Sequence, residues 1–140
     1  MQYEDAYPVV FVRELPGAAT FYTGVLGLEV LFESDFFLLL AIAGEKRGAI
    51  AFALEEHPTT PPNGPAITPG SSVFLTLQVA DAAGAFEELE RAGVTIEYAL
   101  KDEPWGQRRF GLVDPNGLYV DVVEQIKPDP AFWPGHGVGG

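Results

Sequence analysis

One order of hydrophobic patterns occurs twice along this chain, and that repeat limits the possible folds more than any other feature. Each half has a run rich in β-branched and aromatic residues, then apolar residues at helical spacing, a glycine and three extended pieces. Val12 and Val79 hold equivalent places, as do Gly27 and Gly93. A module this small buries its apolar face only by pairing with a copy of itself. The sequence therefore predicts an α+β fold of two βαβββ modules, unless two ordinary amphipathic helices coincide.

The two predicted helices have recognisable start and stop signals. The first lies within residues 15–26, with Pro16 near its first turn, where proline is tolerated, and Gly27 at its end. The second follows Asp81, a residue type that caps helices, and stops at Gly93. The expected extended pieces are 9–12, 28–32, 36–43 and 49–54 in the first half, and 73–79, 94–100, 108–113 and 118–123 in the second.

Proline divides the chain into its parts. Residues 56–65 and 68–71 are rich in proline and short polar residues, which excludes a helix interior or a central strand there. The expected parts are a first module at 1–57, a connector at 58–71, a second module at 72–126 and a tail at 127–140. We expect little regular structure in the tail, with Phe132 and Trp133 as its candidate anchors to a surface.

The composition excludes several classes of function. With 8 Lys and Arg residues against 20 Asp and Glu, the net charge is −12, which argues against a nucleic-acid partner. The absence of cysteine excludes disulfides, thiolate zinc sites and a cysteine nucleophile. The longest apolar run, 36–43, is far shorter than the ~18 residues of a membrane helix, so we expect no membrane partner. The acidic N-terminus lacks a signal-peptide pattern, which favours a cytoplasmic protein.

Three stretches occur in a recognisable order. They are 7–15 with Phe21-Tyr22 and Leu26-Gly27-Leu28, the repeat over about 7–125, and 103–110 with its Pro-Trp-Gly loop followed by Asp114-Pro115-Asn116-Gly117. On these stretches the sequence resembles the vicinal oxygen chelate superfamily of glyoxalases, extradiol dioxygenases and bleomycin-resistance proteins. The third stretch is most similar to the bleomycin-resistance branch. The resemblance implies curved mixed sheets around a groove, usually in a homodimer.

The same resemblance raises the question of a metal. Catalytic members hold one divalent ion through residues of the first and last strands of each module, and these positions fall on Tyr7, Ala51, Phe74 and Asp121. Ala51 and Phe74 have no donor atom, and Tyr7 would have to lose a proton whose usual pKa is about 10. A divalent site usually needs three or more protein ligands. We therefore predict that the chain binds no metal and no other cofactor.

Two residues of the second half are the leading ligand-binding candidates. Trp105 lies in a loop and is either a cap on the core or a stacking platform for a flat or cationic ligand, the role that the resemblance favours. Asp121 lies inside a predicted strand, where Asp is disfavoured, so it needs water or a partner. That partner is Arg108, Arg109 or a ligand cation, and the alternative role for Asp121 is a general base with a raised pKa.

Further candidates come from both halves. Segment 32–37 places acids among aromatic residues beside a tight bend. Phe36 and Phe37 point to opposite faces of a strand, so at most one lines a given surface, and we favour Phe37. The complete set of ligand-binding candidates is Trp105, Phe37, Phe36, Asp35, Phe110, Asp121 and Tyr7. The Asp114 turn and the loop histidines His57 and His136 are assigned no chemistry.

Three functions remain open. The first is metal-independent binding that sequesters a small molecule, cationic and aromatic in its simplest form, for which the acidic charge and the Trp105 loop speak. The second is a lyase, isomerase or dioxygenase-type enzyme that uses a metal or Asp121 as its base. The third is a structural homodimer whose groove is filled by Tyr7, Phe74 and Phe110.

Overall fold

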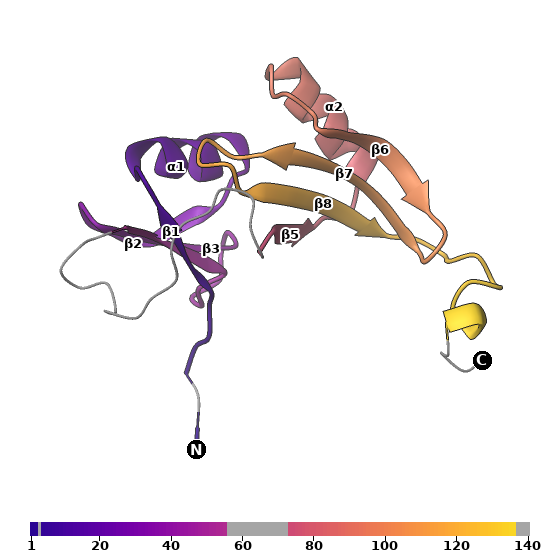
Figure 1. The fold of residues 1–140 in the computed structure, drawn as a ribbon, viewed down its shortest axis with the longest axis horizontal. Coiled ribbons are helices and arrows are strands. Elements are labelled where there is room, and N and C mark those ends of the chain that lie inside the picture. The colour runs from indigo at the N-terminus through magenta and orange to yellow at the C-terminus, as the bar shows by residue number, and fades with distance from the viewer. Residues whose placement is uncertain (3, 56–72, 137–140) are drawn as a thin grey trace. The chain divides into compact units, whose positions relative to one another are not determined.

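A computed structural model describes residues 1–2, 4–55 and 73–136, and the chain forms two compact units, Met1–Ser71 and Ser72–Gly140 (Figure 1). Each unit is described by itself. The expected connector at 58–71 lies outside the described residues. No helix among the described residues has the length and apolar character needed to cross a membrane.

The first unit is a four-stranded mixed sheet with one helical segment. Its elements are β1 (Val9–Val12), α1 (Pro16–Thr20), the π-helical turn η1 (Phe21–Val25), β2 (Glu29–Glu33), β3 (Phe37–Ala41) and β4 (Ile50–Leu54). The strand order is β1-β4-β3-β2, with β1 parallel to β4 and the other pairs antiparallel. Tyr22 of η1 packs its ring 4.9 Å from that of Phe52, and both side chains are fully buried. These two rings fix the helical segment on one face of the sheet.

The first helix differs from the continuous helix that the spacing predicts. It begins at Pro16 as expected, but after Thr20 it widens into η1, where the N–H of Leu26 bonds to the carbonyl of Phe21. The hydroxyl of Thr23 donates to the carbonyl of Ala19 over 2.7 Å. Side chains that bond back to the preceding turn bend helices, which fits the widened turn.

The second unit has the same strand arrangement. Its elements are β5 (Leu75–Gln78), α2 (Ala82–Arg91), β6 (Tyr98–Glu103), β7 (Gln107–Val113), β8 (Tyr119–Gln125) and the short 3₁₀ turn η2 (Pro134–His136). The order is β5-β8-β7-β6, with β5 parallel to β8 and the remaining pairs antiparallel. The predicted order of strand, helix and three strands is therefore confirmed in both units.

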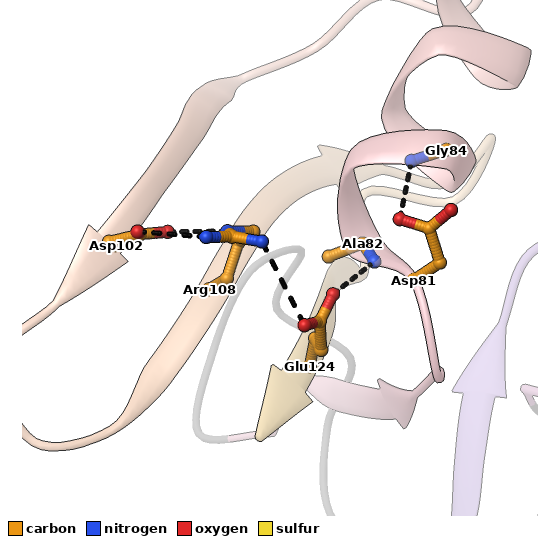
Figure 2. A network of polar contacts seen from close by, with 6 residues as sticks. All are labelled: Asp81, Ala82, Gly84, Asp102, Arg108 and Glu124. Atoms are coloured by element: carbon orange, nitrogen blue, oxygen red, sulfur yellow. Dashed lines mark hydrogen bonds and ion pairs between the residues drawn. The ribbon is translucent and has the colours of Figure 1, made fainter. Parts of the chain in front are cut away.

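A polar network ties the start of α2 to three strands (Figure 2). Asp81 caps the helix as predicted, because its Oδ1 accepts from the N–H of Gly84 over 3.0 Å. Glu124 of β8 accepts from the N–H of Ala82 over 2.9 Å and lies 3.8 Å from Arg108 of β7. Arg108 in turn makes two hydrogen bonds to Asp102 of β6. Two N-terminal donors of α2, the N–H groups of Ala82 and Gly84, are thus satisfied by side chains of its own unit.

One predicted strand is displaced. The pattern predicts an extended piece at 94–100, whereas β6 spans Tyr98–Glu103 and is charged at its end. The strand forms there because Asp102 pairs with Arg108 and Glu103 pairs with Gln107 in the register of β6 and β7. The opposite charges of Asp102 and Arg108, which face each other across the two strands, offset the low β-propensity of these residues.

The C-terminal tail is anchored as expected. The indole N–H of Trp133 donates to the carbonyl of Trp105 over 2.9 Å, and the ring of Phe132 lies 5.9 Å from that of Trp105. The N–H of Asp129 also bonds to the carbonyl of Pro104. The tail thus holds the turn between β6 and β7 in place.

Candidate functional site

The two faces of the second sheet differ in character. Helix α2 covers one face, where the ring of Phe86 lies 5.4 Å from that of the fully buried Phe110. Side chains alternate along a strand, so every second side chain points to the opposite face of the sheet. That face is here called the open face because α2 does not cover it. The residues that the register places on it include Tyr98, Lys101, Glu103, Gln107, Arg109, Gly111, Val113, Tyr119, Asp121 and Val123.

Arg109 lies at the centre of the open face. Its Nε and Nη2 each lie 2.8 Å from Oε2 of the buried Glu103, which also accepts the hydroxyl hydrogen of Tyr98 over 2.9 Å. Lys101 lies 3.5 Å from the other oxygen of Glu103. Burial alone would raise the pKa of Glu103, but the hydrogen bonds from Tyr98 and Arg109 and the two cations outweigh it and lower that pKa. Glu103 is therefore ionised and fully engaged.

Asp121 is the exception in this cluster. Its carboxylate is buried and its Oδ2 lies 3.8 Å from Nη1 of Arg109, an ion-pair distance that is too long for a hydrogen bond. Within the described part of the chain, Oδ1 of Asp121 is buried with no hydrogen-bond partner. Burial raises the pKa of Asp121, Arg109 opposes the shift and the charge of Glu103 adds to it. A buried acceptor without a donor costs free energy that a bound group would recover.

Trp105 lies in the turn between β6 and β7 and faces Arg109. The guanidinium carbon lies 4.9 Å from the centre of the Trp105 ring and 5.3 Å from that of Tyr98. The indole N–H donates to Oε1 of Gln107 over 2.8 Å. The cation that contacts Trp105 is thus Arg109 of the same unit, and the two aromatic rings hold the guanidinium in place.

Tyr119 and Gly111 fit together on the same face. A methyl group on Gly111 would collide with the hydroxyl end of Tyr119 and would lie 2.9 Å from its Cε2. The phenol end therefore lies where another residue would have its Cβ. Burial raises the pKa of Tyr119, and the charge of Asp121 raises it further. The other edge of the Tyr119 ring contacts Phe74, with ring centres 6.0 Å apart.

The positions that the resemblance implies for a metal offer few ligand atoms. Val9 pairs with Ala51 and Thr76 pairs with Asp121, so the register makes Ala51 and Asp121 equivalent in the two units. Ala51 offers no ligand atom, and Asp121 already faces the cation of Arg109. Over the described ranges, no three His, Cys, Asp or Glu residues gather closely enough to hold an ion. The donor set does not fit a divalent metal.

The candidates from the first unit are Phe37, Phe36, Tyr7 and Asp35, and they lie in different places. Phe37 pairs with Ala53 and lies 6.3 Å, ring to ring, from Phe32, whereas Phe36 alternates to the other side. Tyr7 is partly exposed near Gly48, whose added Cβ would lie 3.0 Å from Cδ1 of Tyr7. Asp35 is exposed in the turn before β3. Phe32, Glu33 and Asp35 are exposed in this segment, and the role of the segment in ligand binding stays a prediction.

Within the second unit, the structure brings together two of the predicted site residues, Asp121 and Trp105, through Arg109. Phe110 does not join them, because it is fully buried under α2, and its prediction as a ligand-binding residue is corrected to a core role. Sequence reasoning missed Tyr98, Glu103 and Tyr119. Two acids, Asp102 and Glu103, precede the Pro-Trp-Gly turn and two bases, Arg108 and Arg109, follow it, which is the signal that points to the Glu103–Arg109 pair.

Comparison with known proteins gives a family for this architecture. The family model described as "Glyoxalase/Bleomycin resistance protein/Dioxygenase superfamily" matches residues 6–122. No curated protein matches the chain.

Solved structures share the fold over most of the chain. A protein of unknown function from Agrobacterium tumefaciens str. C58 is 26% identical, with a TM-score of 0.70, covering 90% of this chain and 97% of that one. A superfamily member from Sphaerobacter thermophilus DSM 20745 is 25% identical, with a TM-score of 0.69, covering 88% and 98%. TnmS3 from Streptomyces sp. CB03234, described as an antibiotic binding protein, is 23% identical, with a TM-score of 0.61, covering 89% and 99%.

Proposed function

The chain belongs to the Glyoxalase/Bleomycin resistance protein/Dioxygenase superfamily, and from that premise we propose that it binds a small aromatic molecule without a metal. The ligand lies on the open face of the second sheet. Asp121 accepts a hydrogen bond from the ligand, and the aromatic side chains beside Arg109 pack against its ring. Binding sequesters the molecule and changes none of its bonds.

The main observation behind this proposal is that Asp121 has a buried carboxylate oxygen without a hydrogen-bond donor among the described residues. Oδ1 of Asp121 has no hydrogen-bond partner within the described ranges although it is buried, while Oε2 of the neighbouring Glu103 accepts hydrogen bonds from Tyr98 and Arg109. A buried carboxylate oxygen without a donor is unfavourable for stability, and such groups gather at functional sites. The aromatic rings of Tyr98 and Trp105 lie close by, as in small-molecule sites that combine apolar walls with a few polar groups.

Two further facts support binding. The net charge of −12 favours the approach of a cationic or neutral compound over an anionic one. TnmS3, which is described as an antibiotic binding protein, shares the fold of this chain, so the fold is compatible with small-molecule binding. The poor fit of the Asp121 surroundings to a divalent ion supports the metal-independent form of the proposal.

Titration with a panel of cationic glycopeptide antibiotics and neutral aromatic compounds tests the proposal. Binding is followed by tryptophan fluorescence, to which Trp105 on the open face and Trp133 both contribute, and the variant Trp133→Phe isolates the signal of Trp105. We expect at least one compound to bind, and we expect Asp121→Asn to weaken that binding about tenfold or more, since a charged hydrogen bond is worth about 1.5–3 kcal/mol. The control Glu88→Gln removes the same charge from an exposed position on α2 and leaves binding unchanged. An Asp121→Asn protein that binds like the wild type contradicts the proposal.

A second function is favoured by the same carboxylate. A buried Asp with a raised pKa is suited to take a proton from a bound substrate, so a lyase or isomerase that uses Asp121 as its base is the alternative. A base acts on turnover more than on affinity. An Asp121→Asn protein that keeps its affinity but loses turnover of the same compound selects this alternative.

A further inference from the structure

The phenol of Tyr119 occupies the surface beside Asp121. Gly111 of β7 pairs directly with Asp121 of β8, and the hydroxyl end of Tyr119 lies in the space left by the missing Cβ of Gly111. This space above Gly111 is here called the notch. Its present occupant is a flat ring that ends in a neutral hydroxyl, which both donates and accepts hydrogen bonds.

The polar atoms beside the notch are a carboxylate oxygen without a donor among the described residues and a guanidinium nitrogen too far away to hydrogen-bond that carboxylate. Oδ1 of Asp121 is a buried acceptor without a donor in the described part of the chain, and Nη1 of Arg109 is a donor 3.8 Å from Oδ2 of the same carboxylate. That distance is too long for a hydrogen bond between the two residues. A group with one donor and one acceptor side by side would serve both.

The charges of the cluster select among such groups. Two cations, Lys101 and Arg109, face two anions, Glu103 and Asp121, so these four charges balance, and the charge of Glu97 acts on the Tyr119 phenol as well. A cationic ligand group would meet Arg109, and an anionic one would meet Asp121, each at close range in a partly buried setting. A neutral donor–acceptor group avoids both repulsions.

We propose that the ligand of the open face is a flat aromatic molecule that ends in a neutral donor–acceptor group, such as a carboxamide or a phenol, and takes the place of the Tyr119 phenol in the notch. Tyr119 then acts as a gate that must leave before the ligand reaches Asp121 and Arg109. This inference rests on the proposed binding function of the same face, and adds to it the class of ligand and the residue that controls access.

Three probes with one ring separate the possible ligand groups. Benzamide carries a donor and an acceptor, benzamidinium carries donors and a positive charge, and benzoate carries acceptors and a negative charge. Each is titrated into the ¹⁵N-labelled full chain at neutral pH, and the amide signals of β7 and β8 report binding. We expect benzamide to bind at least about threefold more tightly than either charged probe. Equal or tighter binding of benzamidinium or benzoate overturns the inference.

Two substitutions test the gate from opposite directions. Tyr119→Ala empties the notch and should increase the affinity for benzamide about fivefold or more, because no side chain of the protein then competes for that space. Gly111→Ala places a methyl group in the notch and should weaken benzamide about tenfold or more by steric exclusion. Gly24→Ala is the matched control, because a Cβ at Gly24 meets nothing within 4 Å. Unchanged or weaker binding by Tyr119→Ala overturns the gate.

The outcomes also separate this inference from the proposed function. Two outcomes refute the inference but not small-molecule binding. In the first, the signals of the open face show tighter binding of a charged probe than of benzamide. In the second, Tyr119→Ala and the wild type bind benzamide equally well. A third outcome refutes both the inference and the proposed function. In it, no probe and no compound of the wider antibiotic panel shifts the signals of that face, in the wild type or in Tyr119→Ala.

Discussion

Nη1 of Arg109 lies 3.8 Å from Oδ2 of Asp121, close enough to attract the carboxylate and too far to hydrogen-bond it. The same guanidinium makes short contacts to Glu103 through its other nitrogens. One carboxylate of the open face is thus engaged by its own unit, whereas the other keeps a buried oxygen without a partner in the described ranges. This difference makes Asp121 the residue from which binding is argued.

Asp121→Asn should stabilise the protein at neutral pH. Because burial raises the folded-state pKa of Asp121, the ionised form is less favourable in the folded than in the unfolded chain. We expect the substitution to raise the free energy of unfolding at pH 7 by about 1 kcal/mol. As the pH falls through the raised pKa, the wild type takes up its proton and the difference between the two proteins shrinks. Denaturant unfolding at pH 7 and at acidic pH measures this difference. A variant that is less stable than the wild type at pH 7 would count against a raised pKa of Asp121.

Glu103→Gln should destabilise the second unit. The substitution removes the charge of buried Glu103 and replaces one of its two acceptor oxygens with an NH₂ donor beside Lys101 and Arg109, and we expect a loss of about 1–3 kcal/mol in the free energy of unfolding. Asp102→Asn is the matched control, since Asp102 contacts Arg108 at an exposed position of the same strand and should cost less. Equal losses for the two variants in denaturant unfolding would refute the assigned role of Glu103.

The stability that Glu103 contributes should depend on pH in the direction opposite to that of Asp121. Its pKa is lowered in the folded state, so its contribution is present above the ordinary pKa of 4.5 and is lost as the pH falls through the lowered value. The difference in stability between wild type and Glu103→Gln should therefore narrow on acidification. A difference that is constant from neutral pH down to the acid transition speaks against an ionised Glu103.

Trp133→Phe should loosen the turn that carries Trp105. The variant keeps an aromatic ring but loses the N–H that donates to the carbonyl of Trp105, and we expect a cost of about 0.5–1.5 kcal/mol. The indole ¹⁵N–¹H signal of Trp105 should also shift, because that indole N–H bonds to Gln107 in the same turn. An unchanged signal and unchanged stability would show that the tail does not hold the turn.

The chain should assemble as a homodimer, as the family resemblance implies. Its mass is 15.1 kDa, so light scattering after size exclusion should give about twice that value. A monomer across the accessible concentration range would exclude the dimer.

The fold followed from the sequence where local signals were strong. Asp81 caps α2, and the order of strands and helices was readable from periodicity. The position of β6 was not readable, because its charged residues become strand residues only through partners on β7. Local propensity contains no information about such long-range pairs.

The candidate site could be predicted only in part, because some of its residues come together only through long-range strand pairing. Asp121 and Trp105 are unusual for their local settings, so the sequence alone indicates them. Tyr98 and Tyr119 are ordinary strand residues by pattern, and they join the site through register. The irregular register between Tyr98 and Lys101 and the missing side chain of Gly111 place these rings beside Arg109 and Asp121.

The ionisation of Asp121 can be measured without knowing the ligand. Titration of its side-chain carboxyl ¹³C signal by NMR should give a midpoint above the ordinary 3.8 for this residue type, with Asp121→Asn identifying the signal. A midpoint at or below 3.8 would mean that the carboxylate is already satisfied by its own protein, and it would contradict the account of Asp121 as a group kept for a ligand.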